Sequence, residues 1–334
     1  MIENNKKPAT CTITCNLCNG HDVDVLSQRD RHNNPMQTVI CKGCGLVWTD
    51  PRPDVHSNRK FYAEEYRQQY KATTAPRMKH VYRDMLRAIQ RYKRIRPLLE
   101  SGMKVLDIGA GAGFFPYTVK KQGFEVTGVE PNTGYANYAN EAFGLNVING
   151  FLEDITFEDS SFDVITLNHV LEHLQDPCTA LLRLHAWLKP GGCLNVEVPN
   201  IEATYHSPQH KFHLAHLYTF NPVNLARLGE KAGFVAADVH LVPGTLHINI
   251  LFQKPAARGP RPSSDSYLLP GNYAQIRRVF DAHTAAAHFL SPTPYARFLK
   301  KMYGYSREKL TAGKFKRGRD LADYLIDKYL CPES

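Results

Sequence analysis

From residue 103 onward, short apolar runs alternate with stretches in which apolar residues recur every three or four positions. Apolar runs of this length predict β-strands, and the intervening periodicity predicts helices. The predicted strands cover residues 103–108, 124–129, 145–148, 162–167 and 192–198. The predicted helices between them cover residues 113–122, 134–143 and 176–188. This alternation is typical of parallel strands joined by crossover helices, so we expect an α/β fold with a doubly wound sheet.

Three further elements complete the predicted sheet domain. A helix is expected over residues 222–232, and two apolar runs follow it at 234–241 and 245–252. Only Val242-Pro-Gly244 separates these two runs, so they are predicted to form an antiparallel hairpin. The complete sheet is therefore expected to have seven strands in a Rossmann-like arrangement.

The segments on either side of this sheet have a different character. A helix with one apolar stripe is predicted over residues 77–98, and a short helix or turn over residues 61–70. Residues 254–271 are rich in Pro, Ser and Gly and are expected to form a linker, whereas residues 272–330 are helical, aromatic and basic. We expect a cysteine-rich lobe, a helical linker or lid, the sheet domain, and a linker with a helical extension. These parts cover residues 1–55, 56–100, 101–254 and 255–334.

The composition is that of a globular protein. The 334 residues are 43% hydrophobic and 22% charged, which excludes a collagen-like or a disordered chain. No apolar run reaches the roughly 18 residues that a membrane span needs. The segment Met1–Pro8 has two lysines but no apolar stretch behind them, so no signal peptide is expected and the predicted location is cytoplasmic.

The formal net charge of +9 is concentrated in two segments. Residues 77–96 contain eight Lys or Arg against one Asp, and residues 297–319 contain nine against one Glu. Basic surfaces favour acidic partners such as nucleotide-linked sugars, phospholipid surfaces or nucleic acid. Two solvated helix faces would explain the same pattern, so both interpretations stay open.

Five of the eight cysteines lie within the first 44 residues. Cys15-Asn-Leu-Cys18 and Cys41-Lys-Gly-Cys44 repeat the spacing with which thiolates hold a structural Zn²⁺ ion. A disulfide framework is the alternative, but the absence of a secretory signal disfavours it. We therefore expect a structural zinc site, with Cys11 as a substitute ligand or a bystander.

A glycine-rich turn follows the first strand of the predicted sheet. Gly109, Gly111 and Gly113 lie between this strand and a helix, where glycine lets the backbone approach a ligand closely. The dinucleotide pattern G-x-G-x-x-G would require glycine in place of Phe114. Asp107 precedes the glycines, where an acid can bind the amino group of a ligand directly or through water.

Polar residues also follow the next strands. Glu130 ends the second strand, where a carboxylate can accept hydrogen bonds from both hydroxyls of a ribose. After the third strand, Leu152 offers an apolar surface to an adenine. The fourth strand leads into Asn168-His-Val-Leu-Glu-His173 and then Asp176-Pro.

Together and in this order, these motifs resemble the class I S-adenosylmethionine-dependent methyltransferases over residues 103–253. The resemblance places Asp107 near the methionine amino group of the cofactor, the glycine turn under its methionine and ribose, and Glu130 at the ribose. The cofactor-binding residues that it implies are Asp107, Gly109, Gly111, Gly113, Glu130, Leu152, Glu153 and Asn168.

Two details of the resemblance concern the adenine and the mouth of the site. Leu152 and Glu153 are implied to lie beside the adenine, and Asn168 at the mouth. Many relatives have Asp where this chain has Phe151, so the adenine contact departs from the family pattern.

Four histidines cluster after the fifth strand, at His206, His210, His213 and His216. Methyl transfer to an acceptor that loses a proton needs a general base, and histidine suits this role near neutral pH. The spacing also fits a metal, but no acidic or thiolate residue is interleaved, which disfavours it. We expect one or two of the four to contribute to catalysis and the others to be polar loop residues.

A four-cysteine lobe followed by this fold and a histidine-bearing segment resembles the zinc-binding sugar C-methyltransferases, which act on nucleotide-linked keto-deoxysugars. Two active-site histidines of that group match His173 and His216, the catalytic residues that the resemblance implies. The group has tyrosine and glutamate where this chain has His213 and Ala215, and it continues into a second Rossmann-like domain for which too few residues follow here. These departures favour methylation of oxygen over carbon.

The expected function is methyl transfer from S-adenosylmethionine to a small, anionic or nucleotide-linked acceptor, such as a sugar or a glycan or lipid intermediate. One alternative is an RNA methyltransferase that grips phosphates with the lobe and the basic helices. The lobe has little basic character, and the fourth strand lacks the Asn/Asp-Pro-Pro-aromatic element that orients a base, which disfavours nucleic acid. The other alternative is a non-catalytic cofactor-binding scaffold, docked on a biosynthetic complex or an anionic membrane.

Overall fold

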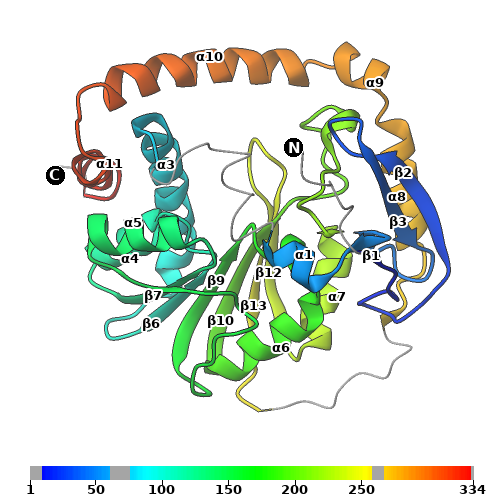
Figure 1. Ribbon diagram of the computed structural model, residues 1–334, viewed down its shortest axis with the longest axis horizontal. Coiled ribbons are helices and arrows are strands. Elements are labelled where there is room, and N and C mark those ends of the chain that lie inside the picture. The colour runs from blue at the N-terminus through cyan, green and yellow to red at the C-terminus, as the bar shows by residue number, and fades with distance from the viewer. Residues whose placement is uncertain (1–9, 61–75, 258–266, 332–334) are drawn as a thin grey trace, which may run out of the picture.

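A seven-stranded sheet lies at the centre of the computed structural model, which describes residues 10–60, 76–257 and 267–331 (Figure 1). The strand order is β12-β13-β10-β9-β6-β7-β8. Strands β8, β7, β6, β9 and β10 run parallel, and β13 is antiparallel to both of its neighbours. The strands are β6 Lys104–Ile108, β7 Glu125–Glu130, β8 Asn146–Asn149, β9 Phe162–Asn168, β10 Leu188–Val198, β12 Val235–Leu241 and β13 Ile248–Gln253. The predicted α/β fold and its terminal hairpin are confirmed.

One strand begins earlier than its predicted bounds of 192–198. β10 starts at Leu188, which pairs with Phe162 of β9, and its register shifts between Leu188 and Cys193. The intervening Lys189-Pro-Gly-Gly192 carries turn residues, which is why the sequence pattern indicates a strand only from residue 192.

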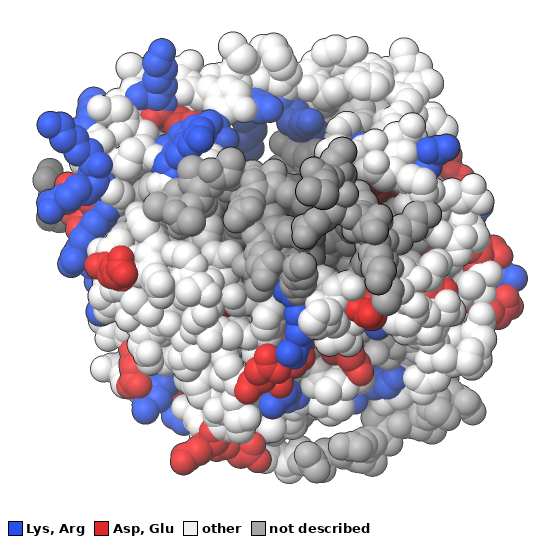
Figure 2. All heavy atoms as spheres, viewed as in Figure 1, with Lys and Arg blue, Asp and Glu red and all other residues white. Residues whose placement is uncertain are grey.

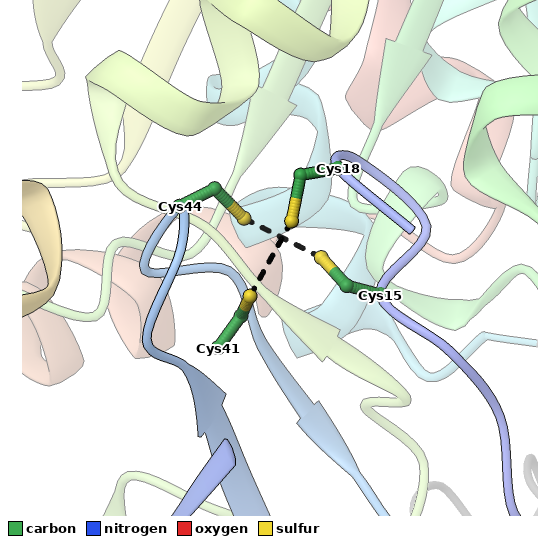
Figure 3. A group of neighbouring side chains, drawn as sticks. All are labelled: Cys15, Cys18, Cys41 and Cys44. Carbon is green, nitrogen blue, oxygen red and sulfur yellow. Dashed lines mark hydrogen bonds between the residues drawn. The ribbon is translucent and has the colours of Figure 1, made fainter. Parts of the chain in front are cut away.

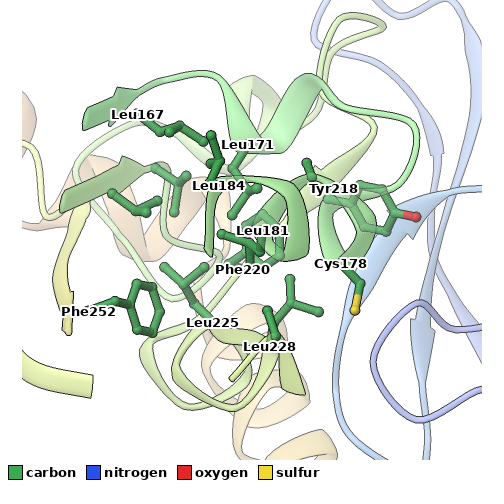
Figure 4. Close-up of a cluster of buried hydrophobic side chains, with 14 of the residues drawn as sticks. Leu167, Leu171, Cys178, Leu181, Leu184, Tyr218, Phe220, Leu225, Leu228 and Phe252 are labelled. Carbon is green, nitrogen blue, oxygen red and sulfur yellow. The ribbon is translucent and has the colours of Figure 1, made fainter. Parts of the chain in front are cut away.

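Helices cover both faces of the sheet (Figure 1). One face packs against α3 Met78–Ile95, α4 Phe114–Lys121, α5 Thr133–Phe143 and α11 Gly318–Leu330. The other face packs against α6 Pro177–Trp187 and α7 Pro222–Lys231. Figure 4 shows leucines of α6 and α7 meeting Leu167 of β9 and Phe252 of β13 in this second layer. Both helices begin with a capped turn and a proline, at Asp176-Pro and Asn221-Pro.

The helix expected in the linker or lid segment belongs to the first layer. The stripe of α3, which includes Val81, Met85 and Ile89, is buried against α4 and α11. Leu321 and Leu325 of α11 fill the same cluster from the far end of the chain. Contacts therefore cross the expected boundaries at residues 100 and 255. The short helix or turn expected over residues 61–70 lies outside the described part of the chain.

The cysteine lobe is a small antiparallel sheet with the order β11-β4-β3-β2. Its strands are β2 Val23–Arg29, β3 Pro35–Cys41, β4 Val47–Thr49 and β11 Tyr218–Thr219, with the ladder β1 Thr10–Cys11 and β5 Arg52–Pro53 and the helix α1 Val55–Lys60 beside it. The segment after β10 thus supplies the edge strand β11 of the lobe. Leu17, Trp48 and Tyr218 are buried in one hydrophobic cluster with residues of α6 and α7, so lobe and sheet share a core.

The C-terminal segment is helical, as predicted, and consists of α8 Asn272–Ala282, α9 Ala285–Leu290, α10 Thr293–Ala312 and α11. The start of α8 is tied to the cysteine loop, since Asn272 Nδ2 donates to the carbonyl of Cys44 at 2.8 Å. In Figure 1, α10 then crosses the top of the molecule from α9 to α11. No helix in the described part of the chain combines the length and apolar composition that a membrane span requires.

Candidate active site

The main cavity opens at the carboxyl ends of the parallel strands and has a volume of about 1020 Å³. Strands β6, β7, β9 and β10 each place an acidic or amide side chain on its wall: Asp107, Glu130, Asn168 and Glu197. Open α/β sheets bind ligands at this edge. The volume is at the upper end of the usual range for small-molecule sites, which leaves room for two reactants.

The structure brings nearly all residues predicted from the sequence to this cavity. The lining residues among them are Asp107, Gly109, Gly111, Glu130, Leu152, Glu153, Asn168, His173 and His216. Gly113 does not line the cavity. A Cβ on Gly113 would lie 2.7 Å from the Cβ of Ala139 and 2.7 Å from Leu145, so this glycine permits helix packing rather than ligand contact.

Lack of space for a side chain at Gly109 and a hydrogen bond from Gly111 define the glycine turn. At Gly109, φ is +76°, and a Cβ would lie 2.4 Å from Cγ2 of Val170, so only glycine fits. The backbone N–H of Gly111 donates to Oε2 of Glu130 at 2.8 Å. This bond joins the turn after β6 to the end of β7 and fixes the carboxylate.

Glu130 is 4% exposed and is held by two backbone amides. Its second oxygen, Oε1, accepts from the N–H of Asn132 at 3.1 Å. Each oxygen keeps a lone pair for another donor, because an ionised carboxylate offers about four acceptor positions. The carboxylate can therefore accept hydrogen bonds from a ligand without losing its anchors.

Asp107 is buried at the floor of the cavity, where Oδ1 accepts a hydrogen bond from the hydroxyl of Thr166 at 2.6 Å. Burial raises the pKa of Asp107 to about 7, although the Thr166 bond acts in the opposite direction. Oδ1 of Asn168, at the end of the adjacent strand, has no hydrogen-bond partner among the described residues. A cationic donor bound here would satisfy both groups.

A cluster of histidines surrounds Glu172, another residue that lines the cavity. Glu172 is fully buried within the 3-10 turn Leu171–His173. Its Oε1 lies 3.2 Å from Nδ1 of His169, 3.8 Å from Nε2 of His173 and 3.9 Å from Nε2 of His216. Burial favours the neutral acid, but His173 and His169 outweigh it and lower the pKa of Glu172.

The two histidines predicted to be catalytic lie next to each other. The rings of His173 and His216 are 4.9 Å apart, and Nδ1 of His173 is 2.7 Å from the carbonyl oxygen of Ala215. This carbonyl requires a proton on Nδ1, so it orients Nε2 toward Glu172. Burial, together with the neighbouring His213 and His173, holds the pKa of His216 well below its usual range. His216 is therefore neutral at the cavity wall.

The other members of the predicted histidine group lie outside the cavity. His213 is buried with its ring 3.7 Å from that of His216, and burial lowers its pKa to about 3. His206 bonds to Arg297, and the exposed His210 bonds to Ser207. The expectation that only one or two of the four contribute to catalysis is consistent with this placement but stays a prediction.

His169 and Glu197 are site residues that the sequence analysis missed. Nε2 of His169 lies 3.2 Å from Glu197, and Nδ1 faces Glu172, so the ring is held between two carboxylates. Burial lowers the pKa of His169, but these two partners outweigh it and the net shift is upward. Burial likewise opposes ionisation of Glu197, yet His169 and Arg91 hold its pKa well below the usual range.

Two arginines of α3 complete this charge network. Arg91 contacts Glu197 at 2.8 Å, and Arg94 also pairs with it. The only sequence signal for Glu197 is a charged residue inside the apolar run Leu194–Val198. A buried charge requires a partner, but the sequence does not show that the partner comes from the basic helix α3.

The four cysteines predicted to bind zinc converge at the base of the lobe, with their sulfurs directed toward one another (Figure 3). Sγ of Cys15 is 3.4 Å from that of Cys44, and Sγ of Cys18 is 3.5 Å from that of Cys41. All four cysteines are free thiols, and their sulfurs lie within 4.8 Å of one another. Four sulfurs at these separations fit the corners of a tetrahedral Zn²⁺ site with Zn–S bonds of about 2.3 Å. Cys11 is exposed and lies outside this group.

The lobe braces the segment that carries Glu172 and His173. Arg52 of β5 donates to the carbonyl of Gln175 at 2.6 Å, and Gln175 Nε2 donates to the carbonyl of Pro53 at 3.0 Å. Asn16, between Cys15 and Cys18, donates to Asp176 at 2.9 Å. The position of the histidine cluster therefore depends on the cysteine loops.

Comparisons with known proteins show what the chain is similar to. A family described as a methyltransferase domain matches residues 78–239. A ubiquinone biosynthesis O-methyltransferase of Pasteurella multocida is 34% identical over 109 residues, which cover 28% of this chain and 45% of the relative. An uncharacterized methyltransferase of Schizosaccharomyces pombe is 31% identical over 164 residues, which cover 41% of this chain and 58% of the relative. The chain thus spans about half the length of these curated relatives.

Solved structures resemble the sheet region. The 1,6-didemethyltoxoflavin-N1-methyltransferase of Burkholderia thailandensis, solved with S-adenosylhomocysteine, is 21% identical with a TM-score of 0.47. The alignment covers 63% of this chain and 96% of that structure.

The raised pKa of Asp107 predicts a pH-dependent gain in stability for Asp107→Asn. The carboxyl of Asp107 loses its proton near pH 4 in the unfolded chain but only near pH 7 in the folded protein. The free energy of unfolding of the wild type therefore falls as the pH rises between these values. The asparagine variant avoids this loss, which reaches on the order of 3–4 kcal/mol above pH 7. Thermal unfolding of the ligand-free protein between pH 4.5 and 8 should show an advantage of the variant that grows with pH.

The exposed Asp159 supplies the control, since Asp159→Asn should follow the wild-type pH profile. An Asp107→Asn variant whose advantage is the same at every pH would show that Asp107 is not a buried neutral acid.

Proposed function

We propose that this chain, whose residues 78–239 match a methyltransferase domain family, transfers the methyl group of S-adenosylmethionine to an oxygen of a small acceptor. The observation that carries the proposal is that one cavity is lined both by acidic residues at the ends of β6 and β7 and by His216, whose Nε2 lies 3.9 Å from Glu172. The acceptor class that fits best is a sugar or a glycan or lipid intermediate with an anionic group.

The residues around β6 and β7 fit the cofactor. Asp107 and Asn168 offer acceptors to the ammonium group of the methionine moiety, and Glu130 offers its remaining lone pairs to the ribose diol. Leu152 and Glu153 line the cavity where the adenine would lie. When bound, S-adenosylmethionine supplies an electrophilic methyl group on a sulfonium.

His216 is the proposed general base. Its neutral imidazole takes the proton that an acceptor hydroxyl releases as its oxygen forms the new bond to carbon. Glu172, 3.9 Å away, stabilises the imidazolium that results, as the acid does in a catalytic triad. His173 is fixed by the carbonyl of Ala215, and its Nε2 lies 3.8 Å from Glu172.

The cavity wall carries acidic and basic side chains, and four of the basic ones could pair with an anionic acceptor. Arg59, Arg87 and Arg183 line it together with Lys300. Arg59 is engaged with Asp154 at 2.8 Å, and Arg87 with Asp84 at 2.9 Å, so a bound anion would compete with exposed ion pairs, which are weak in water. Phosphate groups suit such arginine-rich walls because they can accept two parallel N–H bonds.

We also propose that the four-cysteine cluster holds one structural zinc ion. Four protein ligands leave no open coordination position, so the metal would stabilise the lobe and take no part in the reaction. Through Asn16 and Arg52, the lobe in turn fixes the segment before α6. The zinc would therefore influence activity only through the placement of Glu172 and His173.

For the zinc proposal, the purified chain should contain one zinc ion per molecule by mass spectrometry. Cys44→Ser should lose this ion and unfold at a lower temperature, since structural zinc contributes folding free energy directly. Cys331→Ser, which changes an exposed cysteine outside the cluster, should retain both properties. Equal metal content in the two variants would rule out the cluster as the zinc site.

For the catalytic proposal, His216→Ala should reduce turnover by at least about tenfold, because the proton acceptor is lost. Its affinity for S-adenosylhomocysteine should stay close to wild type, because the cofactor anchors lie on other strands. Turnover is measured as S-adenosylhomocysteine formed with a panel of nucleotide sugars and lipid-linked glycans. His210→Ala, at an exposed position, is the matched control. Wild-type turnover in His216→Ala would remove this residue from the mechanism.

A further inference from the structure

Helices α9 and α10 expose an unusual amount of apolar surface. Leu290 is 88% exposed, Leu310 70% and Leu299 68%. The exposed apolar and aromatic side chains of these two helices are Phe289, Leu290, Tyr295, Phe298, Leu299, Met302, Tyr303, Tyr305 and Leu310. Contiguous apolar surface of this size marks an interaction site in most soluble proteins.

Four of these side chains lie on one face of α10. Tyr295, Leu299, Met302 and Leu310 are separated by four, three and eight residues, which are the spacings of a single helix face. The opposite face is turned inward at Glu308 and Ala312, both of which are buried. The helix is attached there, and its apolar face is directed to solvent.

The charges on this surface have one sign. Between residues 285 and 319, Glu308 is the single acidic residue, and it is engaged with Arg83 of α3, with Arg83 Nη2 donating to it at 3.1 Å. The same stretch contains nine Lys or Arg. Figure 2 shows Lys and Arg side chains gathered at the upper left, over the elements labelled α10, α11 and α3 in Figure 1, with uncharged atoms along the top edge.

We propose that the apolar face of α9 and α10 lies in the interface of an anionic lipid membrane. An amphipathic helix with aromatic and leucine side chains on one face and Lys or Arg beside them has the composition of an interfacial helix. Anionic headgroups would pair with the lysines, whereas a second copy of the chain would bring like charges together. A nucleic acid would bind the basic residues but would leave the leucine face exposed to water.

The location of this surface connects it with the cavity. Lys300 of α10 lines the cavity, and Arg297 donates to the carbonyl of Tyr205, another lining residue, at 3.0 Å. A membrane at α10 would thus lie beside the entrance. Together with the proposed function, on which this step rests, the location favours an acceptor that carries a lipid and an anionic group.

Flotation of the full-length chain with vesicles tests the membrane proposal without any activity assay. The chain should bind vesicles of phosphatidylglycerol and phosphatidylcholine and should not bind vesicles of phosphatidylcholine alone. Leu299→Ser/Leu310→Ser should weaken binding by at least about tenfold, because two exposed leucines no longer enter the bilayer. Lys301→Glu/Lys309→Glu should weaken it as well, since it reverses two charges and keeps every apolar side chain of α10.

Val223→Ser/Val235→Ser removes exposed apolar side chains on α7 and β12 and should bind like the wild type. Calorimetric affinity for S-adenosylhomocysteine should be the same in all variants, which separates this proposal from the proposed function. Absence of vesicle binding, or equal binding to both vesicle types, would overturn it. A wild-type dimer that Leu299→Ser/Leu310→Ser converts to a monomer would assign the face to a second copy instead.

Discussion

The hydrogen bond from the Gly111 amide to Glu130 is the interaction on which the site depends. Parallel strands end at the same edge of the sheet, so the side chains after β6, β7 and β9 must share one space. Charges there are buried, and each must be compensated. The Gly111 bond fixes the Glu130 carboxylate at the cavity wall. The same bond fixes the turn after β6, in which Gly109 has no room for a side chain. The same constraint accounts for Asp107, whose charge is compensated only in part and whose pKa is raised accordingly.

The cluster around His169, Glu172 and Glu197 is built by elements from distant parts of the chain. Glu197 of β10 is ionised within the core because Arg91 and Arg94 of α3 and His169 surround it. The turn with Glu172 is in turn held by the cysteine lobe. Removing one partner would leave an uncompensated buried charge, which is costly. The lobe and α3 therefore hold residues of the cavity wall in place, although neither contributes Asp107, Glu130 or Asn168.

Local sequence patterns predicted the sheet, its hairpin and its layers because each strand and helix has its own periodicity. They also predicted most of the cavity wall, since motifs such as the glycine turn and Glu130 directly follow a strand. They did not predict His169, Glu172 and Glu197 as a unit, because the unit joins the segment after β9 to β10, and the cationic partner of Glu197 comes from α3. Gly113 was assigned to the ligand, but its contacts are with Ala139 and Leu145. Nor does periodicity show that α11 returns to the first layer, because apolar spacing identifies a buried face but not its partner.

Calorimetric titration of S-adenosylhomocysteine into the wild type and into Glu130→Gln tests the central claim most directly. The wild type is expected to bind one ligand with a saturable heat signal. Glutamine can still accept the hydrogen bond from Gly111, but it lacks the negative charge and the second acceptor oxygen of the carboxylate. The affinity of the variant is therefore expected to be at least about tenfold lower, with an unchanged fold by circular dichroism. Absence of binding heat for the wild type over a range of temperatures, or equal affinities of the two proteins, would contradict the central claim.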